Sequence, residues 1–210
     1  MPRPEARTAL AILAKAPVAG LAKTRLSPAL GPDGAAALAE RLLAYTVNEA
    51  LAVGFARLEL CVTPDAGHPL LRALARRPGL WVTLQGDGDL GQRLDRALTR
   101  LLRGYPAALV IGTDAPALDR AMLRAAADAV ARHEAVVVPA LDGGYALIGL
   151  RCAAPALFRN MPWSTGDLMA ATRARAQAEH LDLVELPPVA DIDEPADLIH
   201  LSDAALELRP

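Results

Sequence analysis

Short apolar runs alternate with longer amphipathic segments along the chain. Five runs rich in aliphatic and β-branched residues have the length of single strands, which predicts strands at residues 8–14, 57–63, 80–84, 107–113 and 135–140. The segments between them repeat apolar residues at helical spacing and are rich in Ala, Leu and Arg, which predicts helices at residues 33–53, 68–77, 90–103, 120–132 and 166–179.

This alternation favours one architecture. Each strand–helix–strand unit joins parallel strands through a right-handed crossover, so that helices cover both faces of the sheet. We therefore expect an α/β fold with a single doubly wound, mostly parallel sheet flanked by helices. The chain has 210 residues and no internal repeat or linker, so it is expected to form one domain, residues 1–210.

Composition and charge exclude several classes of protein. A formal charge of -2 provides no basic field, so a nucleic-acid partner is not expected. Arg3 and Arg7 precede an apolar run as in a secretory signal, but Lys15 ends that run after seven residues. No stretch approaches the roughly 18 apolar residues of a membrane span. Cys61 and Cys152 form no CxxC motif, so we expect two buried free thiols and a cytoplasmic protein.

Two common catalytic motifs are absent from the sequence. It contains no GxSxG or Walker A motif, and its histidines share no metal-ligand spacing. Hydrolase and P-loop NTPase functions are therefore not expected. Residues 86–91 match the pattern GxGxxG, which by itself is weak evidence, and a dinucleotide-dependent redox function is not expected. Doubly wound sheets bind ligands beyond the carboxyl ends of their strands, so the loops at those ends hold the candidate chemistry.

The loop after the first predicted strand carries three cations. "AKAPVAGLAKTRL" (14–26) contains Lys15, Lys23 and Arg25, while a proline and Gly20 prevent regular structure. Backbone amides and cations at a strand end suit a phosphate chain. The alternative is a solvated loop, because Lys and Arg are mostly surface residues. The position after the first strand favours the phosphate site.

The third predicted strand ends in a glycine-rich loop, "QGDGDLGQR" (85–93). Asp89 and Gln92 have the spacing of a capping box, which is a sufficient structural explanation for most of the motif. Gly86 and Gly88 would also allow a nucleoside to lie against the backbone.

Two acidic segments are candidates for a metal site. "GTDAPALD" (112–119) places Asp114 directly after the fourth strand, and Mg²⁺ prefers one or two carboxylates together with substrate phosphates. The alternative is that Asp114 only caps a turn. In "ADIDEPADL" (190–198), either Asp191 or Asp193 is a candidate second ligand.

"VVVPALDGGYALIGL" (136–150) is a strong signal for a β-hairpin that turns at Asp142, Gly143 and Gly144. The sequence favours a purely structural role for this turn in the hairpin, and the alternative is that Asp142 or Tyr145 contacts the substrate.

"MPWSTGDL" (161–168) has Ser164 and Asp167 at capping-box spacing. Trp163, just before it, either staples the helix to the core or lines a pocket.

Five motifs occur together in a fixed order: "AKAPVAGLAKTRL", "QGDGDLGQR", "GTDAPAL", "DGGYALIGL" and "PWST". Spanning roughly residues 8–200, they resemble the selenodomain-associated family 1 transferases, arsenosugar-biosynthesis-type glycosyltransferases of the nucleotide-diphospho-sugar transferase superfamily. The resemblance implies a glycosyltransferase-A-like, Rossmann-like fold and a Mg²⁺ or Mn²⁺ cofactor. It implies nucleotide binding by Lys15, Lys23 and Arg25, metal binding by Asp114 with Asp193 as second ligand by position, and an acceptor-side role for Asp142 to Tyr145.

Two departures leave the chemistry open. Glycosyltransferases of this fold carry an Asp-x-Asp motif, whereas "TDAP" offers one Asp and is more like the nucleotidyltransferase branch. Sugar-phosphate nucleotidyltransferases open with a Gly-Gly-rich loop, whereas this first loop contains only Gly20, and its "AKTRL" signature is similar to that of phospholactate guanylyltransferases.

Three functions follow as expectations. The first is glycosyl transfer from a sugar nucleotide to a small-molecule acceptor, with Lys23 and Arg25 sharing the diphosphate charge and Asp142 deprotonating the acceptor hydroxyl. The second is nucleotidyl transfer from a nucleoside triphosphate to a small phosphorylated substrate, which needs no base. The third is a non-catalytic nucleotide-binding module, because fold alone does not imply catalysis.

Overall fold

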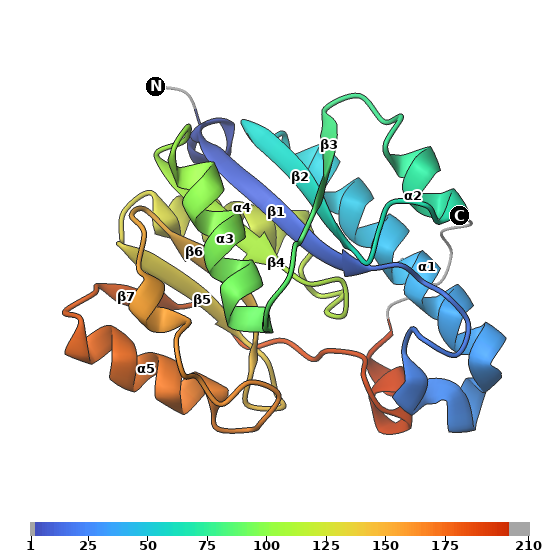
Figure 1. The fold of residues 1–210 in the computed structure, drawn as a ribbon. Coiled ribbons are helices and arrows are strands. Elements are labelled where there is room, and N and C mark those ends of the chain that lie inside the picture. Colours follow the sequence, from blue (N-terminus) through green and yellow to red (C-terminus); the bar gives the residue numbers. More distant parts are fainter. Residues whose placement is uncertain (1–2, 202–210) are drawn as a thin grey trace.

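Seven strands form one sheet in residues 3–201, the part of the chain that the computed structural model describes (Figure 1). In chain order they are β1 (Thr8–Lys15), β2 (Arg57–Thr63), β3 (Leu80–Leu84), β4 (Ala107–Ile111), β5 (Ala135–Pro139), β6 (Tyr145–Leu150) and β7 (Leu183–Glu185). Their spatial order is β3-β2-β1-β4-β6-β5-β7. The predicted domain limits, residues 1 and 210, lie outside the described range.

Helices cover both faces of this sheet, which confirms the predicted doubly wound class (Figure 1). They are α1 (Ser27–Val53), α2 (Pro69–Leu74), α3 (Leu90–Leu102), α4 (Arg120–Val130) and α5 (Leu168–Ala178). Short 3₁₀ helices span Pro4–Arg7, Thr24–Leu26, Pro155–Leu157 and Pro195–His200. The apolar sides of α1, α2 and α4 pack in one core cluster, and those of α3 and α5 in a second.

The sheet is mostly parallel, as predicted. β1 pairs in parallel with β2 and β4, β2 with β3, and β5 with β7. β6 is antiparallel to both β4 and β5, so β5 and β6 form the predicted hairpin. None of the helices within residues 3–201 is long and apolar enough to cross a membrane.

The chain reverses its order in the sheet between β1 and β4. From β1 it moves outward to β2 and β3, and it then returns to place β4 on the other side of β1. Such a reversal separates the loops that follow the two central strands and leaves a crevice at their carboxyl ends. Because β6 is antiparallel, its first residue, Tyr145, lies at this same edge of the sheet.

The structure corrects two local predictions. Helix α1 begins at Ser27 rather than at residue 33, with an interruption at Gly31, whose φ is 73°. Cys61 is buried as expected, but Cys152 is exposed. Cys152 follows Arg151 beyond the end of β6, where the chain has left the sheet, so the prediction of two buried thiols was wrong for Cys152.

Candidate functional site

A cavity of about 760 Å³ lies at the carboxyl ends of the central strands. Most of the predicted site residues line it, namely Lys15, Lys23, Arg25, Asp114, Asp142, Gly144, Tyr145, Trp163 and Asp193. The structure does not place Gly20, Gly86, Gly88 or Gly143 in its lining. The nucleoside contact of Gly86 and Gly88 stays a prediction.

Lys23 makes the closest polar contacts in the cavity. Its side chain is 8% exposed, and its Nζ lies 2.5 Å from Oδ1 of Asp114 and 2.9 Å from Oδ1 of Asp193. It also donates to the carbonyl of Ile192. Burial lowers the pKa of Lys23, but the two carboxylates more than offset this effect and the pKa is raised. An ammonium group has three N–H donors, and here all three are engaged by the protein.

Lys15 and Arg25 also line the cavity and are more exposed than Lys23. Nζ of Lys15 donates to the carbonyl of Leu21 at 2.8 Å and is exposed. Arg25 is exposed and lines the cavity, and its side chain makes no ion pair or hydrogen bond with any residue in the range 3–201. The three cations therefore do not form one equivalent set, because Lys23 is directed at carboxylates.

Gln85 and Arg93 also line the cavity, although neither was predicted as a site residue. Gln85 is buried directly after β3, and its amide nitrogen donates to the carbonyls of Ala14 and Cys61, both at 3.0 Å. Its amide oxygen accepts from Nη1 of Arg93 at 3.2 Å. A polar residue at the carboxyl end of a strand was the signal that could have identified this pair.

The backbone holds Asp114 and Asp193 so that they converge on one cation. Ile192 is 0% exposed, and its N–H donates to the carbonyl of Asp114 at 2.8 Å. The Asp193 N–H donates to the Asp197 carboxylate at 3.0 Å. Burial raises the pKa of Asp114, Lys23 opposes that rise, and Asp193 adds to it.

These two carboxylates fit a divalent cation. Both approach the same ammonium within hydrogen-bond distance, and Mg²⁺ typically binds through one or two carboxylates while keeping waters and substrate phosphates. Across residues 3–201 no group of three or more His, Cys, Asp or Glu side chains forms a metal cluster. The remaining ligands of a metal at Asp114 and Asp193 would therefore come from substrate and water.

Asp142 and Asp191 add two further carboxylates to the cavity. Oδ1 of Asp142 accepts from the N–H of Gly144 at 2.8 Å, which closes the hairpin turn. Burial, reinforced by the carboxylate of Asp142, raises the pKa of Asp191 to about 6. The ionised form of Asp191 is thus disfavoured in the folded protein.

We expect Asp191→Asn to stabilise the fold at pH 8. Asp191 titrates near 3.8 without its folded surroundings and near 6 within them, so its charge opposes folding above pH 6, and this cost disappears below about pH 4. Because Asp191 is only half-buried, we expect a gain of about 1 kcal/mol rather than the full value of the shift. Thermal denaturation of both proteins from pH 4 to 8, in EDTA, measures the difference. A gain that does not shrink toward pH 4 contradicts this origin.

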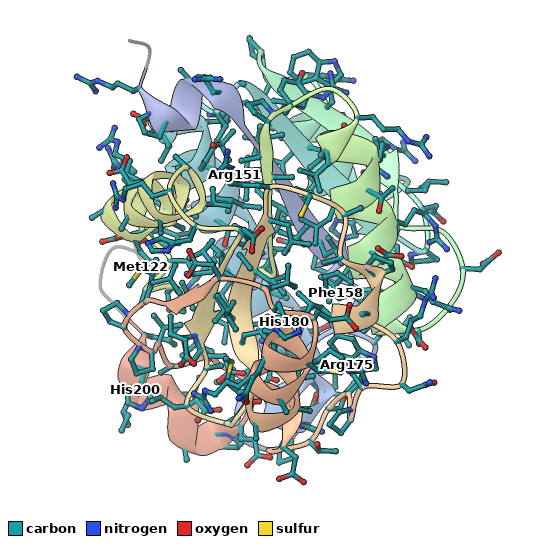
Figure 2. The ribbon with its side chains drawn as sticks, turned by 90° about the vertical axis from the view of Figure 1, so that its left-hand side faces the viewer. Met122, Arg151, Phe158, Arg175, His180 and His200 are labelled. Atoms are coloured by element: carbon teal, nitrogen blue, oxygen red, sulfur yellow. The ribbon has the colours of Figure 1, made fainter. Side chains whose placement is uncertain are left out.

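Trp163 lies against the first turn of α3 because residue 91 is a glycine. A Cβ on Gly91 would lie 2.7 Å from the Trp163 ring and 2.3 Å from the carbonyl oxygen of Phe158. Arg175 of α5 fixes the segment around Phe158, since its guanidinium donates to the carbonyl of Ala156 at 2.6 Å (Figure 2). The indole is therefore held by close packing on the cavity wall.

Tyr145 and Trp163 form an aromatic corner of the cavity. Their ring centroids are 6.4 Å apart and their planes meet at 80°. The hydroxyl of Tyr145 is buried and has no hydrogen-bond partner among the described residues, and burial raises its pKa. A Cβ on Gly143 would lie 2.1 Å from the carbonyl oxygen of Gly166, so the hairpin turn needs glycine there to meet the Trp163 loop.

The predicted capping box of Ser164 and Asp167 was wrong. No side chain caps α5, and Ser164 has a φ of 61°. Instead, the hydroxyl of Thr165 donates to the carbonyl of Pro162 at 2.8 Å and accepts from the N–H of Asp167 at 3.3 Å. The capping box predicted at the start of α3, Asp89 with Gln92, is confirmed.

Comparisons with known proteins agree with this fold. The model of one family, described as "Uncharacterized protein conserved in bacteria (DUF2064)", matches residues 46–165. No curated protein matches the sequence. A Desulfovibrio desulfuricans G20 protein, provisionally named a nucleotide-diphospho-sugar transferase, is 29% identical, with a TM-score of 0.84 over 91% of this chain and 84% of that chain.

Two more distant structures share the fold alone. Rv0371c of Mycobacterium tuberculosis H37Rv, in complex with manganese, is 21% identical and has a TM-score of 0.52 over 92% of this chain and 96% of that chain. A CMP:2-keto-3-deoxy-manno-octonic acid synthetase complexed with CTP is 11% identical and has a TM-score of 0.56 over 92% of this chain and 95% of that chain. The fold is thus one that nucleotide-sugar transferases and nucleotidyltransferases share.

Proposed function

The chain belongs to the DUF2064 family of bacterial proteins, and we propose that it transfers a group from a nucleotide-activated donor. The preferred reaction is glycosyl transfer from a sugar nucleotide to a small-molecule acceptor. One observation carries the proposal, namely that the cationic loop after β1, Asp114 after β4 and Asp193 after β7 line one cavity at the switch point of the sheet. We take this sheet and its helices as a single transferase domain.

The residues of the cavity suit this reaction. Asp114 and Asp193 would hold a Mg²⁺ or Mn²⁺ ion, which when bound supplies charge neutralisation for the departing nucleoside diphosphate. Arg25 presents a guanidinium that can bind two phosphate oxygens, and Lys15 adds a point charge. Asp142 has one carboxylate oxygen engaged by Gly144, which leaves the other to accept a proton from an acceptor hydroxyl.

Nucleotidyl transfer is the second candidate, favoured by the single Asp after β4 and by the fold shared with a CTP-bound synthetase. In that reaction a phosphate oxygen of the acceptor attacks the α-phosphorus of a nucleoside triphosphate and pyrophosphate leaves. The same cations would neutralise the charge, but the attacking phosphate is already anionic and needs no base. The two reactions therefore differ in whether they need Asp142 as a base.

We expect nucleotide binding that depends on a divalent metal and is weakened by Arg25→Ala. Loss of one guanidinium that binds phosphate costs about 1.5–3 kcal/mol, which is roughly a tenfold to hundredfold loss of affinity. Calorimetry with sugar nucleotides and nucleoside triphosphates, with and without Mg²⁺, measures it. Arg124→Ala, at an exposed position of α4, is the matched control. Absence of metal-dependent binding of every nucleotide would contradict both candidate reactions.

A further inference from the structure

The ammonium of Lys23 stands between the two carboxylates that the proposed function assigns to a divalent metal. Its Nζ contacts Oδ1 of Asp114 at 2.5 Å and Oδ1 of Asp193 at 2.9 Å. We infer that Lys23 is the resident counter-cation of this pair in the ligand-free protein and exchanges with the divalent metal when a nucleotide phosphate enters the cavity. The inference rests on the proposed metal–nucleotide function, and it adds that metal and nucleotide bind as mutually dependent ligands.

Interactions that do not involve Lys23 hold Asp114 and Asp193 in place. Ile192 is buried in a core cluster with Leu26 and the first half of α1, and its N–H bonds the carbonyl of Asp114. The N–H of Asp193 is bonded by the Asp197 carboxylate, which also accepts from Glu194 at 2.7 Å. The two carboxylates therefore stay together when the ammonium leaves.

Lys23 and the loop before it are the part of this contact that can move. Lys23 follows a loop whose residue Leu21 is 58% exposed. The start of this loop is tied to β2 by the N–H of Ala16, which donates to the carbonyl of Thr63, but the part nearest Lys23 makes local backbone bonds, from Leu21 and Ala22 to the carbonyl of Val18. Lys23 itself has φ 47° and ψ 42°, a left-handed conformation that is unfavourable for a residue other than glycine. Its interactions with Asp114, Asp193 and Ile192 offset this strain, so loss of those contacts frees the loop to adopt other conformations.

Charge explains why the exchange needs both ligands. Asp114, Asp193 and Lys23 together carry a net charge of -1, which repels a phosphate chain. A divalent metal in place of the ammonium neutralises the two carboxylates, and the released Lys23 becomes a free cation for the phosphates. The bound metal thus makes the cavity more favourable for a phosphate, and the bound phosphate makes it more favourable for the metal. By linkage, each ligand raises the affinity of the other by the same factor.

The test measures Mn²⁺ binding without nucleotide, by electron paramagnetic resonance of the free ion. Lys23→Met keeps the length of the side chain and removes its charge, and Arg124→Met, which removes a charge at an exposed position of α4 outside the cavity, is the control. We expect Lys23→Met to bind Mn²⁺ at least tenfold more tightly than the wild type, and Arg124→Met to match the wild type. Asp193→Asn added to Lys23→Met should abolish the gain, which places the ion at this pair.

Nucleoside diphosphate is then added to each protein. It should tighten Mn²⁺ binding strongly in the wild type and much less in Lys23→Met. The inference is overturned if Lys23→Met binds Mn²⁺ alone no more tightly than the wild type, or if the gain survives Asp193→Asn. A failure of the proposed function would differ, because nucleotide would then have no effect on any protein. Circular dichroism checks the fold, and Lys23→Gln replaces Lys23→Met if the latter does not fold.

Discussion

Asp114→Asn should lower turnover by about 10³-fold, because the charge stabilisation that a metal supplies in such a reaction is worth several kcal/mol. Asn has nearly the same shape as Asp, and its amide oxygen can still accept from the Lys23 ammonium. The side chain lines the cavity and Asn fills the same space, so the substitution leaves the packing around it intact. Turnover is measured as release of nucleoside diphosphate or pyrophosphate from whichever nucleotide binds in calorimetry.

Asp87→Asn is the control for this experiment, since Asp87 is exposed and lies outside the cavity that holds Asp114. Its turnover should equal that of the wild type. Raising the Mg²⁺ concentration should partly restore Asp114→Asn, because Asp193 still offers one carboxylate. Full activity of Asp114→Asn at ordinary Mg²⁺ concentration would refute its assignment as a metal ligand.

Asp142→Asn should reduce turnover by about 10²- to 10⁴-fold if glycosyl transfer is the reaction, which is the range that general-base catalysis contributes. Nucleotide affinity should be unchanged, because an Asn oxygen can accept from the Gly144 N–H and keep the turn closed. Turnover and calorimetric affinity, measured on the same preparation, separate the loss of a base from the loss of binding.

The control is Asp167→Asn, an exposed carboxylate that precedes α5 and is not among the residues lining the cavity. It should behave as the wild type. Undiminished turnover of Asp142→Asn would remove the base assignment and favour nucleotidyl transfer, in which the attacking phosphate carries its own negative charge.

Local patterns in the sequence were enough to predict the main helices, most of the strands and their order of connection, whereas the short strand β7 was not predicted. Strand and helix periodicity, the Asp89–Gln92 cap and the turn at Asp142–Gly144 all involve residues within a few positions of one another. The prediction was wrong where two neighbouring hydroxyl side chains could each bond the backbone at a helix start. At the start of α5 the hydroxyl of Thr165, rather than that of Ser164, is the one that bonds the neighbouring backbone.

The sequence by itself also determined which loops would meet, because parallel strands bring their carboxyl ends to one edge. It did not determine which charges would pair there. Lys23 and Asp193 are 170 positions apart, and their contact depends on where the segment after β7 returns to the sheet. That path is set by burial of Ile192 against Leu26 and α1. Only the tertiary structure decided that Lys23, rather than Lys15 or Arg25, forms the ion pairs with Asp114 and Asp193, since ion pairing depends on distance in space.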